Sequence, residues 1–117
     1  MTGLRRLFGG MPPEPPGTAD VRLIAEMAAA GIDLSQPLRV EHFLYFPQER
    51  PARQVVARLA GLGGELRIAP AGGRRWLVHL VLPMRVTPER IAALRTELEA
   101  LAAIHGGEYD GWGAPAG

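Results

Sequence analysis

Apolar residues recur every three or four positions in three segments of the chain, the spacing that places them along one face of an α-helix. The first predicted helix begins at a capping Thr18 or Asp20 and ends at Gly31, which favours a left-handed stop. The second lies within 48–64, and the third begins at the capping residue Thr87; both end at paired glycines. Their predicted buried positions are, in chain order, Val21, Ile24, Met27 and Ala28, then Ala52, Val55, Val56, Leu59 and Leu62, then Ile91, Leu94, Leu98 and Leu101.

Four other segments are typical of β-strands, because they are short and rich in β-branched, aromatic and other large apolar residues. The clearest is "LRVEHFLYF", over 38–46, which ends at Pro47. The segments 64–70 and 76–83 flank the Gly-rich stretch "AGGRR" and predict a hairpin. The fourth segment, 108–112, is short, and the sequence leaves open whether it forms a last strand or a strap across the sheet.

The predicted order is helix, strand, helix, strand, strand, helix, strand. The last six elements have the βαββαβ order of ferredoxin-like α+β folds, in which two helices cover one face of an antiparallel sheet. We therefore predict a ferredoxin-like α+β domain with an extra N-terminal helix over residues 18–113. The prolines that precede it predict a flexible proline-rich leader over 1–17, and the last residues predict a flexible tail over 114–117.

The chain closes with "HGGEYDGW", in which aromatic residues lie among turn formers. If this segment joins the sheet, Tyr109 and Trp112 dock a terminus that would otherwise fray. We therefore interpret the motif first as a structural clasp. Asp110 has two interpretations: its carboxylate caps the turn in which it lies, as Asp before Gly commonly does, or it belongs to an exposed recognition patch with Glu108, Tyr109 and Trp112.

Both faces of the predicted sheet are apolar. Successive strand residues point to opposite faces. Along the first strand, one face therefore receives Val40, His42, Leu44 and Phe46, and the other receives Glu41, Phe43 and Tyr45. Two helices bury only one face. The second face is left for the first helix, a second copy of the protein or a partner.

Composition restricts the chemistry that this chain can perform. Its 117 residues include no cysteine, which excludes disulfides, thiolate catalysis and cysteine-ligated metals. The 13 basic residues are all arginines, and 12 carboxylates nearly cancel them to a net charge of +1. Nucleic-acid-binding proteins usually have a strong basic excess in one patch. No apolar run is long enough for a transmembrane helix or a signal peptide, so we expect no membrane partner and a cytoplasmic location.

The histidines do not predict a catalytic or metal site. His42 and His79 can be neighbours on adjacent strands, but Glu41 and His42 point to opposite faces, and neither an HxH nor an HExxH motif occurs. Ser35 is the only serine in the sequence and has no nucleophile motif around it. We therefore expect no enzyme activity, no cofactor and no metal.

The segments "VEHFLYF" at 40–46 and "GGEYDGWG" at 106–113 resemble segments of the family of regulators of ribonuclease E activity B, also called ribonuclease E inhibitor B. The resemblance also includes the element order over roughly 20–113. It implies a non-catalytic protein that binds an endoribonuclease and lowers or redirects bacterial RNA decay. The family's best-known members are strongly acidic, whereas this chain is close to neutral, so electrostatic attraction to a basic partner segment is largely missing here.

The predicted partner is therefore a protein, with ribonuclease E as the candidate that the resemblance implies. The predicted partner-binding residues are Phe43, Tyr45, Glu108, Tyr109, Asp110 and Trp112. A homodimer is the first alternative. An RNA-binding module is the second, in which Phe43 and Tyr45 stack on bases and nearby arginines contact phosphates. Direct RNA binding is the less favoured alternative because the RNP consensus is absent, and we expect most of those arginines, at positions 39, 67, 74 and 75, to form a solvated rim.

Overall fold

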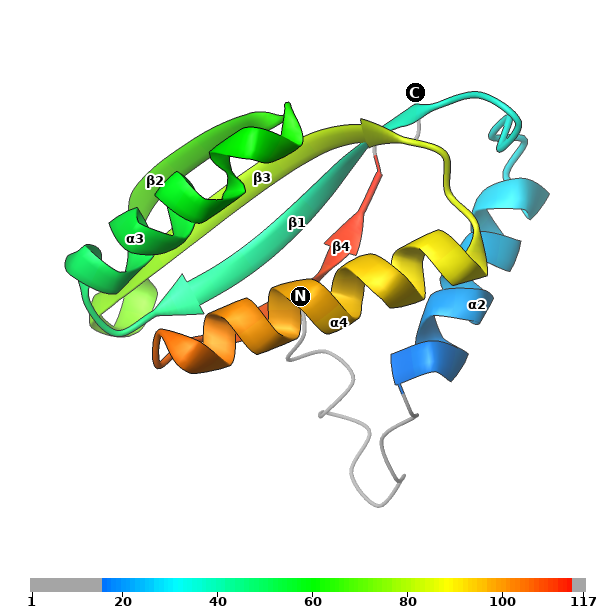
Figure 1. Cartoon of the computed structure of the whole chain (residues 1–117). Helices are drawn as coiled ribbons and strands as arrows, with labels where there is room; N and C mark the ends of the chain where they lie inside the picture. Colours follow the sequence, from blue (N-terminus) through cyan, green and yellow to red (C-terminus); the bar gives the residue numbers. More distant parts are fainter. Residues whose placement is uncertain (1–15, 115–117) are drawn as a thin grey trace, which may run out of the picture.

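The computed structural model describes residues 16–114, which form an α+β domain with a four-stranded antiparallel sheet and three α-helices (Figure 1). The predicted tail beyond 114, and all but the last two residues of the predicted leader, lie outside the described residues. The helices are α2 (Pro16–Ala29), α3 (Glu49–Leu59) and α4 (Pro88–Ile104), and the strands are β1 (Leu38–Phe46), β2 (Glu65–Ala71), β3 (Arg75–Met84) and β4 (Glu108–Gly113). No helix among the described residues is long and apolar enough to cross a membrane.

The strands lie in the order β2-β3-β1-β4, so β1 and β3 are central and β2 and β4 form the edges. Every neighbouring pair is antiparallel. The closing segment is thus a strand paired with β1, which decides between the two predicted forms in favour of the strand. The pairing of β1 with β4 shifts register between Phe43 and Leu44, where β4 has an extra residue that forms a β-bulge.

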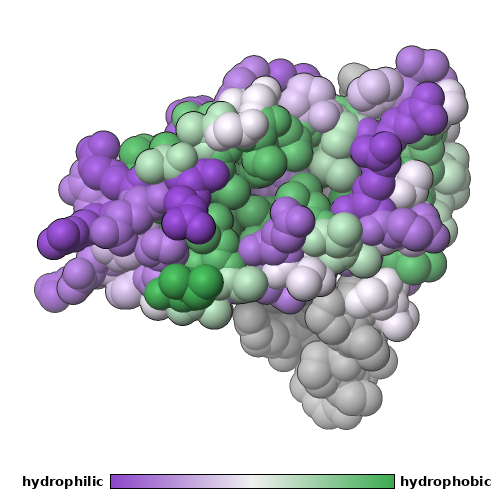
Figure 2. Space-filling model, in the orientation of Figure 1, coloured by the Kyte–Doolittle hydropathy of each residue, from purple (hydrophilic) through white to green (hydrophobic). Residues whose placement is uncertain are grey.

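The helices α3 and α4 lie on the same face of the sheet, and α2 packs beside α4 (Figure 1). We call this the covered face; its β1 residues are Val40, His42, Leu44 and Phe46. Two apolar clusters fill the space beneath the helices. One lies under α3 and α4 and includes Leu44, Val55 and Leu98, and the other lies under α2 and includes Ile24 and Trp112. Figure 2 shows apolar side chains in the middle of this side, between the polar outer surfaces.

Helix α4 begins as predicted. The Thr87 hydroxyl accepts a hydrogen bond from the backbone N–H of Arg90 at 3.1 Å, and Pro88 occupies the first turn, where its missing N–H costs nothing. The helix leads into β4 through two glycines. Gly106 has a φ of +77°, and a Cβ at Gly107 would overlap the ring of Phe46 and the backbone oxygen of Tyr45. Glycine is therefore required where the chain turns back onto β1.

Several details of the helices differ from the prediction. Helix α2 begins at Pro16, so Thr18 and Asp20 lie inside it and do not cap it. Its buried stripe is rotated toward Asp20, which makes contacts in the interior, so Val21 is 52% exposed and Ala28 is exposed too. Leu62 is 43% exposed because the chain leaves α3 in a short 3₁₀ turn, which breaks the α-helical spacing.

Candidate functional site

The structure separates the six predicted partner-binding residues by the face on which they lie. Tyr109 and Trp112 pair with Leu44 and His42 and point to the covered face. Phe43, Tyr45 and Glu108 point to the opposite face, which we call the open face. The predicted residues therefore do not form one site, and each face has to be described by itself.

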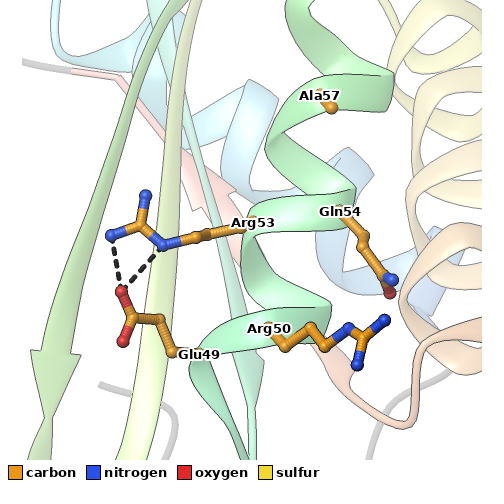
Figure 3. A pocket seen from close by; sticks show the side chains of 5 residues that line it. All are labelled: Glu49, Arg50, Arg53, Gln54 and Ala57. Carbon is orange, nitrogen blue, oxygen red and sulfur yellow. Dashed lines mark hydrogen bonds and ion pairs between the residues drawn. The ribbon is translucent and has the colours of Figure 1, made fainter.

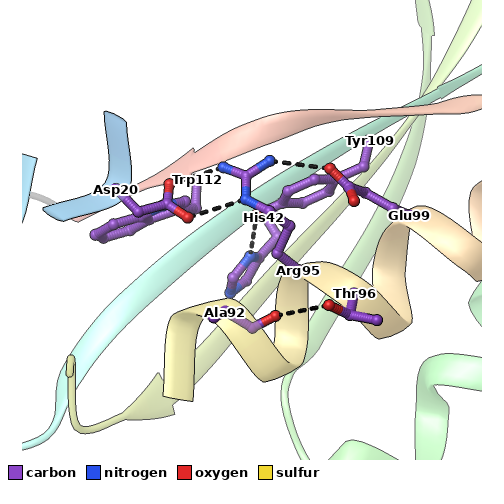
Figure 4. Close-up of polar contacts among 8 residues, drawn as sticks. All are labelled: Asp20, His42, Ala92, Arg95, Thr96, Glu99, Tyr109 and Trp112. Atoms are coloured by element: carbon purple, nitrogen blue, oxygen red, sulfur yellow. Dashed lines mark hydrogen bonds and ion pairs between the residues drawn. The ribbon is translucent and has the colours of Figure 1, made fainter. Parts of the chain in front are cut away.

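On the covered face, the Asp20 carboxylate connects three elements of the fold (Figure 4). Its oxygens accept hydrogen bonds from Arg95 Nε at 2.9 Å, Arg95 Nη2 at 2.8 Å and Trp112 Nε1 at 2.9 Å. The side chains of Asp20 and Arg95 are 7% and 17% exposed. Arg95 also donates to Glu99 at 3.2 Å. The hydrogen bonding of Arg95 to the Asp20 carboxylate is the largest cause that raises the pKa of Arg95, so the guanidinium stays charged beneath α2.

Beside this ion pair, His42 Nδ1 lies 3.0 Å from the Tyr109 hydroxyl. His42 is 1% exposed, and burial, with smaller effects from Arg95 and His79, lowers its pKa to about 4. Burial likewise raises the pKa of Tyr109. Both side chains are therefore neutral near pH 7. His42 Nε2 has no hydrogen-bond partner among residues 16–114.

The two sequence segments that carry the family resemblance thus meet in the interior. His42 belongs to "VEHFLYF", and Tyr109 and Trp112 belong to "GGEYDGWG". Their contacts fix β4 to β1 and to α2. The geometry agrees with the interpretation of the closing motif as a clasp: on the covered face, Trp112 is buried and Tyr109 is partly buried.

The open face consists of alternate residues of the four strands. They are Arg39, Glu41, Phe43 and Tyr45 of β1, Glu65, Arg67 and Ala69 of β2, Arg75, Leu77, His79 and Val81 of β3, and Glu108 of β4. Helix α2 does not cover this face, because it packs against α4 on the other side. The prediction that the first helix covers the second apolar face is therefore wrong, and the remaining two predicted occupants are a second copy and a partner.

Aromatic rings and charged groups alternate across the open face. The Phe43 and His79 rings stack with centroids 5.0 Å apart, and His79 Nε2 donates to the Glu41 carboxylate at 2.9 Å. The Arg75 guanidinium lies 4.3 Å above the centre of the Tyr45 ring. Tyr and Arg, which are both present on this face, are enriched at protein–protein interfaces.

His42 and His79, the two histidines considered for a metal or acid–base site, point to opposite faces of the sheet. His42 pairs with Leu80 across the sheet, whereas His79 pairs with Phe43. Among the described residues, no group of three His, Asp or Glu side chains is arranged to hold a metal ion.

Asp110 lies at the bulge of β4. It is partly buried, and no hydrogen bond to its carboxylate is found among the described residues. The predicted turn-capping bond is therefore not formed there. Asp110 is the extra residue of the bulge and has no counterpart on β1.

Two of the hollows on the surface of residues 16–114 were compared as possible ligand sites. The larger, about 520 Å³, is lined only by five residues of α3, among which Arg53 turns toward Glu49 (Figure 3). Because all its lining residues come from one helix, nothing encloses a ligand there. The smaller, about 260 Å³, lies on the open face. Its lining residues come from three strands: Arg39, Glu41, Glu65, Arg67, His79 and Val81.

Sequence reasoning missed the interior ion pair. Asp20 and Arg95 are 75 positions apart, and each lies in a helix whose local pattern only indicates a solvated side chain. The one local signal is the rotated stripe of α2, where Asp20, Ile24 and Met27 are spaced as one helix face. The arginines expected to form a solvated rim include Arg39 and Arg75, which form ion pairs with Glu65 and Glu108.

Comparison with models of known protein families matches residues 18–114 to one family, the regulator of ribonuclease activity B. The match covers nearly all of the described chain and includes both segments on which the resemblance was recognised. No curated protein matches the sequence.

Proposed function

Because this chain belongs to the family of regulators of ribonuclease activity B, we propose that it acts in the cytoplasm by binding an endoribonuclease and changing its activity, without catalysing a reaction itself. Family membership supports a role in regulating ribonuclease activity. The more specific choice of an endoribonuclease, with ribonuclease E as the first candidate, comes from the resemblance of the two sequence segments to the family.

The observation that carries this proposal is the open face. Phe43 and Tyr45 lie there on a central strand with no described helix over them, and they are accompanied by Glu108. A sheet face with partly exposed aromatic residues that no described helix covers is a candidate interaction site. We propose Phe43, Tyr45, Glu108 and Asp110 as partner-binding residues. Tyr109 and Trp112 support the surface from within.

We also propose that the fold is ferredoxin-like with an added N-terminal helix. The strand order β2-β3-β1-β4, the antiparallel pairing of all neighbours and the position of α3 and α4 on one face support this assignment. In such a fold the second face is free for binding, which agrees with the role given to the open face.

The test is a calorimetric titration of the protein with the host's full-length ribonuclease E at near-physiological salt. We expect a dissociation constant in the micromolar range or below, and we expect Tyr45→Ala and Phe43→Ala to weaken binding at least tenfold. Ile104→Ala is the matched control, because Ile104 is an apolar side chain 77% exposed on α4, on the other side of the molecule. Cleavage of an RNA oligonucleotide by the enzyme should change with the wild-type protein and not with Tyr45→Ala.

Four results would contradict the proposal in different ways. Equal losses for Tyr45→Ala and Ile104→Ala would exclude the open face as the interface. No binding by the folded wild-type protein would exclude ribonuclease E as the partner. A dimer that Tyr45→Ala dissociates, detected by sedimentation, would assign the face to a second copy. RNA affinity that falls steeply with salt would instead indicate an RNA-binding module.

A further inference from the structure

Arg67 is the one ionised side chain lining the smaller hollow for which no partner is found among the described residues. Arg39 donates to both carboxylate oxygens of Glu65, at 3.1 and 3.2 Å. Glu41 accepts from His79 at 2.9 Å. Arg67 is exposed on the edge strand β2, across from His79 in the register of the sheet. Its guanidinium is therefore free to bind a group from outside.

The size of the hollow limits what can enter it. Its volume of about 260 Å³ lies below the range of pockets that enclose drug-sized molecules, which begins at roughly 300 Å³. The hollow is thus suited to one side chain or one small ion. Because its wall is built from three neighbouring strands, its shape is held by the sheet and not by a loop.

The charges of the wall favour a single anion over a cation. Both carboxylates already accept hydrogen bonds, Glu65 from Arg39 and Glu41 from His79, whereas Arg67 has no acceptor among the described residues. An anion can bind the Arg67 guanidinium without breaking either pair. The planar guanidinium presents two parallel N–H groups that match the two oxygens of a carboxylate.

We propose that this hollow binds a carboxylate side chain, Asp or Glu, of the protein partner, with Arg67 as its charged contact. The inference rests on the proposed function for the identity of the partner, but the site itself is a property of this chain. A polyanionic RNA backbone fits less well. Glu41 and Glu65 line the same hollow, and the formal charges of its two arginines and two glutamates cancel. A chain of phosphates would bring several negative charges close to these two carboxylates, whereas a single carboxylate brings one.

The site can be tested directly by nuclear magnetic resonance with ¹⁵N-labelled full-length protein. The probe is a triglutamate peptide, and triglutamine is its uncharged counterpart. We expect a saturable shift of the Arg67 Nε–H resonance and of the backbone amide of His79, with a dissociation constant on the order of 1 mM. Arg67→Gln should weaken the response of the His79 amide at least tenfold. Arg58→Gln, which alters an exposed arginine of α3, should leave it unchanged.

Repeating the ribonuclease E titration with Arg67→Gln and Arg58→Gln distinguishes the proposed carboxylate site from the proposed function. Weaker binding by Arg67→Gln but not by Arg58→Gln, together with the triglutamate response, would support both. A triglutamate response without ribonuclease E binding would retain the carboxylate site and reject that partner. The carboxylate site is overturned if triglutamate and triglutamine act alike, if Arg58 responds as Arg67 does, or if a hexauridine RNA shifts Arg67 at lower concentration than triglutamate.

Discussion

Neighbouring residues of β1 have opposite surroundings. Val40, His42, Leu44 and Phe46 are 0 to 1% exposed under the helices. Glu41, Phe43 and Tyr45, which alternate with them, are only partly buried and lie on the open face. The two sets differ little in apolar character. The difference in burial comes from the helices that lie over one set, so the strand supplies the core with half of its residues and leaves the other half on the open face.

The ion pairs of the two faces show the same contrast. Asp20 and Arg95 are shielded beneath α2, and their bonds are shared with Trp112. Arg39 and Glu65 on the open face have comparable bond lengths, but their side chains are 58% and 66% exposed. A shielded pair cannot lose one partner without leaving a charge in the interior, whereas water replaces the partner of an exposed group. Two ion pairs of similar geometry therefore contribute differently to the stability of the fold, because one is shielded and the other is exposed.

The largest difference should follow from truncating two consecutive residues of β1. Leu44→Ala removes a fully buried side chain and should lower the free energy of unfolding by about 4 kcal/mol. Tyr45→Ala, on the open face, should lower it by no more than about 1 kcal/mol. Urea unfolding followed by circular dichroism measures both. Equal losses would show that the open face is as important to the fold as the core.

Loss of the interior carboxylate should have the next largest effect. Asp20→Ala leaves the Arg95 guanidinium and the Trp112 N–H without their acceptor, and we expect a loss of about 3 kcal/mol in urea unfolding. Asp20→Asn, which keeps one oxygen acceptor, should lose less. Asp33→Ala provides the control, since its carboxylate bonds only to the nearby Ser35 and is exposed. A wild-type midpoint for Asp20→Ala would contradict the role of this carboxylate in holding α2.

Lowering the pH should lower the free energy of unfolding, because the buried His42 on the covered face is neutral in the folded protein. Its pKa is about 4 in the folded protein and 6.5 ordinarily, so the unfolded chain takes up a proton at pH values where the folded chain does not. The stability from the neutral imidazole is complete above about pH 6.5 and falls as the pH drops toward 4. The loss is about 2 kcal/mol between pH 6.5 and pH 5. His42→Gln should remove that slope, and His79→Gln, on the open face, should retain it.

The smallest effect is expected from the exposed ion pair. Arg39→Ala removes both bonds to Glu65, and water replaces them, so the urea midpoint should not change measurably. The variant should nevertheless have a changed affinity for the partner if the open face is the interface. A clear loss of stability from Arg39→Ala, comparable to that of Asp20→Ala, would remove the distinction between the two faces.

Much of the local structure could be predicted from the sequence because it depends on neighbouring residues. Thr87 and Pro88 start α4, Gly31 ends the first helix with a φ of +90°, and the apolar alternation of β1 is visible in its residues. The docking role of Tyr109 and Trp112 could also be predicted, because large aromatic side chains that follow a glycine turn are stabilised by packing against a surface. Their partners could not be predicted: Asp20 lies 92 positions from Trp112, and His42 lies 67 positions from Tyr109.

The sequence by itself determined the order of helices and strands, the strong helix ends, the near-neutral charge and the family. Only the tertiary structure decided which apolar face of the sheet is covered, where α2 packs and which predicted binding residues are interior. The physical reason is that β1 is apolar on both sides, so its periodicity predicts two candidate cores with nothing local to choose between them. The choice is made by the path of the chain, which brings α3 and α4 over Val40, His42, Leu44 and Phe46 and leaves Phe43 and Tyr45 uncovered by any described helix.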